Sequence, residues 1–203
     1  MRAPIDLLVL GVLALAVYTA ATSRLAARIG ACSLQGALLA GLSVFVGRGR
    51  GVLPTATAAS AIFLLKAVII PLFLRRAVRR SGVRREAAPA VSLHGPLVAV
   101  AALTGLAFWL GGRMLLPAPL ASAIGVRVGL ATLLVGLYMA ISARTELAQV
   151  IGYLIAENGV FVCGQILLGG VPLVIELGVL LDVLVAGMLM TVLFVLARQE
   201  ERP

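Results

Sequence analysis

The chain has 203 residues, of which 62% are hydrophobic and only 12% are charged, and its mean hydropathy is +1.13. Soluble domains carry about 25% charged residues, so a chain of this composition has too little polar surface to cover a soluble core. The net charge of +9 does not indicate nucleic-acid binding, because the arginines cluster in short loops without aromatic side chains for base stacking. We therefore expect an all-α integral membrane protein.

Seven segments are long enough to cross a bilayer, which takes about 20 mostly apolar residues. They are residues 5–21, 27–46, 56–74, 91–110, 120–141, 147–168 and 171–197. The first segment differs from a secretory signal peptide, because only Arg2 precedes it whereas Arg24 and Arg28 follow it. We expect it to be retained as a membrane helix.

The arginines predict the orientation of these seven spans. Positively charged loops stay on the cytoplasmic side, and one set of alternate loops holds eleven arginines against at most five in the other. The richer set consists of Arg24, Arg28, Arg75, Arg76, Arg79, Arg80, Arg84, Arg85, Arg144, Arg198 and Arg202. The N-terminus is therefore expected outside and the C-terminus in the cytoplasm.

The longest basic loop, residues 75–90, divides the chain into a three-helix segment, 1–74, and a four-helix segment, 91–203. Its role as a topology determinant already accounts for its charge. Docking of a cytoplasmic partner subunit on this loop stays an open alternative.

Four ionisable residues fall inside the expected spans, namely Lys66, Glu157, Glu176 and Asp182. Such groups are costly in a bilayer and are functional by default. Lys66 is the only lysine beside sixteen arginines, and a buried lysine can release its proton whereas an arginine cannot. We predict proton exchange at Lys66, with a structural ion pair to a neighbouring helix as the alternative. The nearby Pro71 is expected to open the backbone hydrogen-bond ladder.

The two acids Glu157 and Asp182 lie on spans joined by a short turn at residues 169–172. Each is about 18 Å from that turn at 1.5 Å per residue, so they share one depth and can pass or share a proton. Asn158 is suited to holding a water beside them, and Gly159 to admitting a water or a close neighbour. Glu176 is either a relay step or a solvated acid at the start of a helix.

The remaining candidates carry weaker signals. His94 stands at the start of the fourth span, where a capping or interface residue is more common than a proton-pathway residue. Cys32 and Cys163 lie far apart inside apolar segments, and with a single histidine they provide no metal-ligand set. The sequence also offers no nucleophile constellation, so we expect no catalytic residue and no bound metal.

Two C-terminal stretches, RTELAQVIGYLIAENGVFVCG and PLVIELGVLLDVLVAGMLM, together with LLKAVIIP in the third span, resemble hydrogenase-4 component E. That family comprises small membrane subunits of group 4 nickel–iron hydrogenases and formate hydrogenlyase-type complexes. Its last three helices are related to the K-type subunit of respiratory complex I, whose pattern is similar to GLEIMIN. Here residues 152–158 read GYLIAEN, with the acid three residues later, a departure that favours the hydrogenase type.

The resemblance implies a non-catalytic subunit without its own redox centre or cofactor, in the plasma membrane of a prokaryote. Antiporter-like and quinone-module-like subunits and lipid would surround it, and a peripheral hydrogenase-like module would lie further away. Protons would pass through Lys66, Glu157, Asp182, Glu176 and Asn158, with His94 as a possible pathway residue. Two alternatives remain open: a small subunit of a multi-subunit cation/proton antiporter, and a structural spacer whose ion pairs set the helix register.

Overall fold

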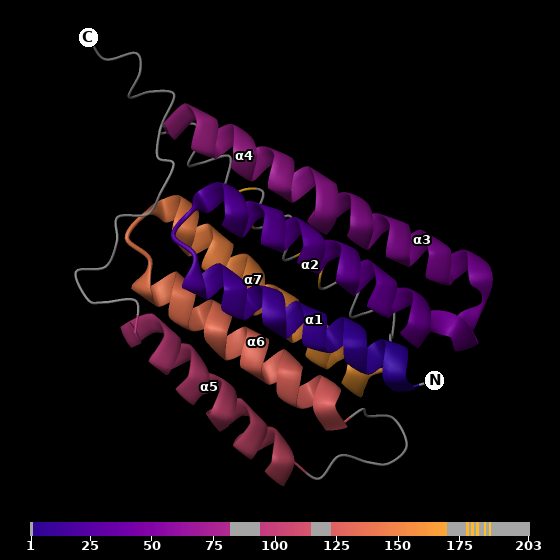
Figure 1. The fold of residues 1–203 in the computed structure, drawn as a ribbon. Helices are drawn as coiled ribbons and strands as arrows, with labels where there is room; N and C mark the ends of the chain where they lie inside the picture. The colour runs from indigo at the N-terminus through magenta and orange to yellow at the C-terminus, as the bar shows by residue number, and fades with distance from the viewer. Residues whose placement is uncertain are drawn as a thin grey trace.

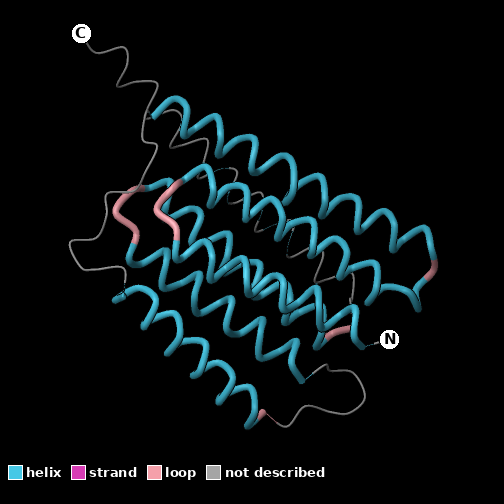
Figure 2. Tube along the Cα trace, viewed as in Figure 1, coloured by secondary structure: helices cyan, strands magenta, loops and turns pink. Residues whose placement is uncertain are grey.

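The computed structural model describes residues 2–81, 94–114 and 123–169, together with residues 178, 180, 182, 185 and 187. The regular elements of those three ranges are helices (Figure 2). They are α1 (Arg2–Ala21), α2 (Leu25–Val46), α3 (Val52–Ile62), α4 (Ile70–Ser81), α5 (His94–Arg113), α6 (Ala123–Ser142) and α7 (Glu146–Leu167). A 3-10 turn, η1 (Gly47–Arg50), precedes α3, and a π-helical segment, η2 (Phe63–Ile69), joins α3 to α4 without a break.

Six of the seven expected spans are present as helices that are long and apolar enough to cross a membrane. In the described part of the chain they are Ala3–Ala21, Leu25–Val46, Val52–Arg80, Gly95–Arg113, Ile124–Ser142 and Glu146–Leu167. The third is longer than predicted, because α3, η2 and α4 form one continuous helix. The predicted seventh span, 171–197, lies outside the described residues apart from five isolated positions. This architecture is typical of a multi-pass membrane protein.

The helices run alongside one another in a bundle with α7 near its centre (Figure 1). α7 packs against α6, α2 and α4, whereas α5 packs mainly on α6 at one edge. The burial of the two helices agrees with these contacts. In an 18-residue apolar stretch of α7, 72% of the residues are buried, against 17% in the corresponding stretch of α5. Residues on α7 therefore lie in the interior of the bundle, including those that the sequence singled out.

Most of the arginines within the described ranges lie at one end of the bundle. The α1–α2 turn, the end of α4 and the α6–α7 turn lie at the same end (Figure 1). They carry Arg24, Arg28, Arg144 and the arginines of α4. The alternation of loops that was assumed for the positive-inside argument is thus present in the six described spans.

Glycines bring α6 and α7 unusually close together. Gly129 and Gly136 on α6 and Gly152 and Gly159 on α7 are each seven residues apart, and a Cβ at Gly136, Gly152 or Gly159 would collide with backbone atoms of the facing helix. Small residues allow such contact between membrane helices. The position of Gly159 is therefore explained by a close neighbour, α6. The seven-residue spacing was the sequence signal for this interface, and it was missed.

Candidate functional site

Three of the ionisable groups singled out in the sequence meet in the interior of the bundle. Nζ of Lys66 donates hydrogen bonds to Oε1 of Glu157 at 2.5 Å and to Oδ1 of Asp182 at 2.9 Å. The three side chains are 4%, 2% and 3% exposed, respectively. Lys66 comes from η2 and Glu157 from α7, so segments far apart in the chain supply this cluster. We refer to Lys66, Glu157 and Asp182 as the buried triad.

The charges of the buried triad do not balance when all three groups are ionised. One ammonium then faces two carboxylates, which leaves a net charge of −1. The second oxygen of Glu157, Oε2, is buried and has no hydrogen-bond partner among the described residues. An uncompensated charge is costly away from water, so one additional proton on the two carboxyl groups would make the cluster neutral. The centroid of the Phe161 ring lies 5.8 Å from Nζ of Lys66, so the ring offers a further favourable contact for the ammonium.

The backbone around Lys66 departs from a regular α-helix. Within η2 the hydrogen bonds span five residues in place of four, and the N–H of Ile70 bonds the carbonyl of Leu65 five residues earlier. Pro71 follows directly, and a proline ring clashes with the carbonyl four residues before it in a regular helix. The predicted opening of the ladder near Pro71 therefore takes the form of a π-helical turn, a feature that often marks functional sites.

Helix α2 supports this widened turn from the side. The hydroxyl of Ser33 donates to the backbone carbonyl of Ala67 at 2.5 Å. Gly36 lies so close to the backbone of Lys66 and Ala67 that a Cβ there would collide with it. In a regular helix the N–H of residue 71 would donate to the carbonyl of Ala67. Pro71 has no N–H, so the Ser33 hydroxyl satisfies this carbonyl instead. α2 thus holds η2 in place and sets the position of Lys66.

Two buried side-chain amides, Asn158 beside Glu157 and Gln35 on α2, form a series of hydrogen bonds that we call the amide chain. Nδ2 of Asn158 donates to Oε1 of Gln35 at 3.1 Å, and Nε2 of Gln35 donates to the carbonyl of Val12 on α1 at 2.8 Å. The sequence interpretation included Asn158 but missed Gln35. The signal was available, because Gln35 is a polar amide in the middle of the expected span 27–46, where such side chains hydrogen-bond to neighbouring helices.

A small cavity lies between the buried triad and Asn158. Its volume is about 10 Å³, and it is lined by Cys32, Lys66, Ile70, Leu154 and Asn158. That volume is close to what one water molecule needs, provided that polar partners are at hand. Lys66 and Asn158 both line the cavity and both carry polar groups, so a water in it would connect the triad to the amide chain.

The other candidate residues are placed differently. Glu176 lies outside the described residues. His94 begins α5, and its side-chain surroundings lie outside the described part of the chain. Gln149 is exposed in the first turn of α7, whereas Gln165 is buried further along the same helix.

The described residues also contain no metal-ligand cluster. Cys32 and Cys163 are both free thiols, and no group of three or more histidine, cysteine or carboxylate side chains within the described ranges is placed to hold a metal ion. The arrangement offers charge and proton chemistry at the buried triad.

Comparison with known proteins gives two kinds of relative. The chain is 31% identical over 160 residues to the uncharacterized protein Rv0085 of Mycobacterium tuberculosis, a match that covers 78% of this chain and 73% of that protein. It is 29% identical over 138 residues to hydrogenase-4 component E of Escherichia coli K12 and of Shigella flexneri. This second match covers 66% of the chain but only 62% of the relative. No protein-family model matches the chain, and no solved structure matches it significantly.

Proposed function

Because the chain belongs to the same family as the mycobacterial protein Rv0085, and because it is distantly similar to hydrogenase-4 component E, we propose that it is a non-catalytic membrane subunit of a complex I-like, group 4 hydrogenase-type redox complex. Its role is to contribute to proton translocation, or to the coupling of proton translocation to electron transfer. The buried triad carries that role.

The single observation behind the proposal is that one lysine amine bonds two carboxylates inside the membrane-spanning bundle. The cluster has two protonation states that matter here: one with an extra proton, which is neutral, and one without it, which carries a charge of −1. A charge change on a neighbouring subunit shifts the balance between them through the low-dielectric interior. The triad can therefore take up and release one proton in response to events elsewhere in the complex.

The surroundings of the triad provide a route for that proton. The cavity beside Lys66 has room for one water, which would connect Lys66 with Asn158 and, through Gln35, with α1. The amide chain positions this water and does not itself ionise. Glu176 and His94 would extend the route toward the two membrane surfaces.

The proposed topology has seven spans, with the N-terminus outside, the C-terminus in the cytoplasm and the protein in the inner membrane of a prokaryotic cell. The basic residues 75–90 would separate a three-helix segment, 1–74, from a four-helix segment, 91–203. The clustering of arginines at one end of the bundle supports this orientation. A phosphatase and a fluorescent reporter fused in turn to the C-terminus would test it, since only the fluorescent fusion is active in the cytoplasm.

The proposed partners are antiporter-like and quinone-module-like membrane subunits, with a peripheral hydrogenase-like module attached through them. Affinity purification through a C-terminal tag in mild detergent, followed by mass spectrometry, would identify these partners. Iron–sulfur and hydrogenase-like or quinone-reductase-like subunits are the expected companions. Antiporter subunits alone would contradict the redox assignment and favour a small antiporter subunit.

The ion-pair geometry itself favours a second candidate, a structural spacer in which the triad only sets the register of α7 against η2. Buried charged groups can specify such a register. In that case proton movement would not depend on the triad, whereas assembly would.

The deciding experiment replaces Glu157 by glutamine and Asp182 by asparagine in the native complex. Each change leaves Lys66 with one carboxylate, a neutral pair that preserves folding. We expect both variants to assemble and to lose redox-driven proton uptake into inverted membrane vesicles by about tenfold or more. E146Q is the matched control, because Glu146 is exposed in the first turn of α7. Uptake that remains normal in both triad variants would refute the relay and leave the spacer.

A further inference from the structure

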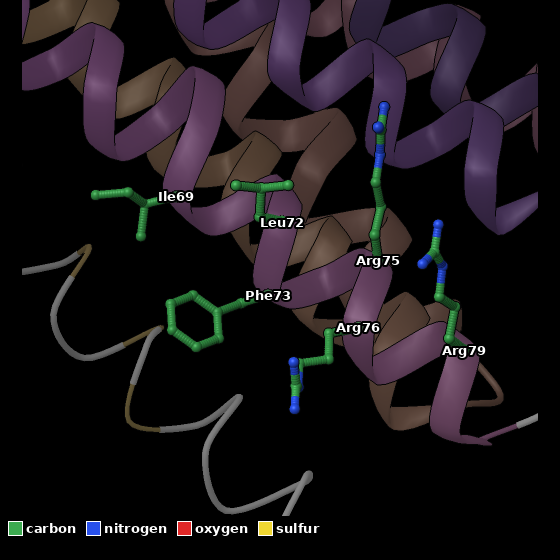
Figure 3. A pocket seen from close by; sticks show the side chains of 6 residues that line it. All are labelled: Ile69, Leu72, Phe73, Arg75, Arg76 and Arg79. Carbon is green, nitrogen blue, oxygen red and sulfur yellow. The ribbon is translucent and has the colours of Figure 1, made fainter.

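The outer surface of the continuous α3–α4 helix changes from apolar to basic toward its end. Six residues of η2 and α4 line a groove of about 560 Å³, namely Ile69, Leu72, Phe73, Arg75, Arg76 and Arg79. Figure 3 shows the three apolar side chains followed along the helix by the three arginines. We refer to this as the α4 groove. It lies at the surface of the bundle, and its residues play no part in the buried triad.

The spacing of these residues places both kinds of side chain within reach of one ligand. Ile69, Leu72, Phe73 and Arg76 follow the i, i+3, i+4, i+7 pattern of a single helix face. Arg75 and Arg79 are one turn apart and lie together on the Leu72 side of that face, where Figure 3 shows them extending away from Arg76. The groove extends over about 15 Å of helix at 1.5 Å per residue, so its apolar half lies at membrane depth and its basic half at the end of the span.

The three arginines of the groove present exposed guanidinium groups, which suit an anion. All three are exposed, and none of them has an acidic partner among the described residues. Guanidinium groups bind phosphate through two parallel hydrogen bonds. A ligand that suits the whole groove therefore needs a phosphate at one end and an apolar chain at the other.

We propose that the α4 groove binds one anionic phospholipid. Its phosphate binds the basic end of the groove, between Arg76 on one side and the pair Arg75 and Arg79 on the other, and an acyl chain lies along Ile69, Leu72 and Phe73. The volume is that of an ordinary ligand site, and basic pockets beside membrane helices suit acidic lipids. An acidic protein segment fits less well, because the apolar half of the groove lies where an irregular peptide would leave backbone groups unsatisfied.

Native mass spectrometry of the full-length protein, delipidated in mild detergent, tests the proposal with phosphatidylglycerol and phosphatidylcholine as probes. We expect the wild-type protein to bind phosphatidylglycerol in preference to phosphatidylcholine at equal concentration. R76Q should lower that affinity by about fivefold, and R75Q/R79Q by about 25-fold, since each arginine near the membrane surface contributes a comparable amount. Inorganic phosphate should not compete, because it has no acyl chain.

Arg80 and Arg24 provide matched controls. Both are exposed and lie at the same end of the bundle, but neither lines the groove. R80Q and the double variant R24Q/R80Q should change the affinity by less than twofold. Equal losses in R24Q/R80Q and R75Q/R79Q would overturn the proposal in favour of diffuse surface charge. Equal binding of the two lipids would also overturn it. So would a purified complex that retains no phosphatidylglycerol and in which a partner subunit covers Arg76.

Discussion

Replacing Lys66 by methionine isolates the electrostatics of the buried triad. Methionine is unbranched and adaptable, so it fills a similar volume, but it removes the ammonium that both carboxylates contact at 2.5 and 2.9 Å. The side chains of Glu157 and Asp182 are only 2% and 3% exposed, so water cannot replace the lost partner without local opening. Lys66→Met therefore leaves two buried carboxyl groups beside each other.

The expected cost follows from this burial. Removing one partner of a buried ion pair destabilises a protein by about 3–5 kcal/mol, and here one lysine serves two acids. For a chain of this size 1 kcal/mol corresponds to about 2–4 °C in melting temperature, so K66M should melt about 6–20 °C below the wild type. The triple variant K66M/E157Q/D182N contains no buried charge, and it should recover at least half of that loss. E157Q and D182N alone keep a neutral pair and should cost less than K66M.

Thermal unfolding of the detergent-solubilised protein, followed by circular dichroism at 222 nm, measures these differences. Lys66→Arg separates charge from proton exchange, because arginine keeps the positive charge but does not deprotonate. K66R should therefore be more stable than K66M and still fail to support proton uptake. A melting temperature for K66M within about 2 °C of the wild type, or a triple variant no more stable than K66M, would show that the lysine does not neutralise the two acids.

Two further predictions concern the packing around the triad. G159A should lower the stability of the protein by about 1–3 kcal/mol, because its Cβ collides with the α6 backbone. G105A has open space on the exposed surface of α5, so it should raise stability by up to about 1 kcal/mol; a loss in both variants would contradict the close approach of α6 and α7. N158L or Q35L alone leaves a buried amide unpaired and should cost about 1–3 kcal/mol. The double variant N158L/Q35L should cost less than the sum of the two, and strict additivity in a denaturation cycle would mean that the amides do not interact.

Much of the site was accessible from the sequence, for a physical reason. Lys66, Glu157 and Asn158 stand out because each interrupts a long apolar segment, and the cost of a polar group in a bilayer makes such an interruption informative wherever it falls. The same hydropathy pattern predicted the first six spans. The equal distance of Glu157 and Asp182 from the turn at 169–172 also placed the two acids at one depth.

The partners of these groups were decided only by the tertiary structure. Lys66 bonds residues 91 and 116 positions away along the chain, and Asn158 bonds Gln35 from 123 positions away. Such pairings depend on how each helix is rotated about its own axis, and helices that are apolar on nearly every side carry little information about that rotation. In this protein backbone contacts determine the rotation of the helices. The glycines pack α7 closely against α6, and Gly36 and Ser33 hold α2 against the widened turn of η2. Depth in the membrane is therefore readable from the order of the residues, whereas the direction in which each polar side chain points emerges only when the helices pack.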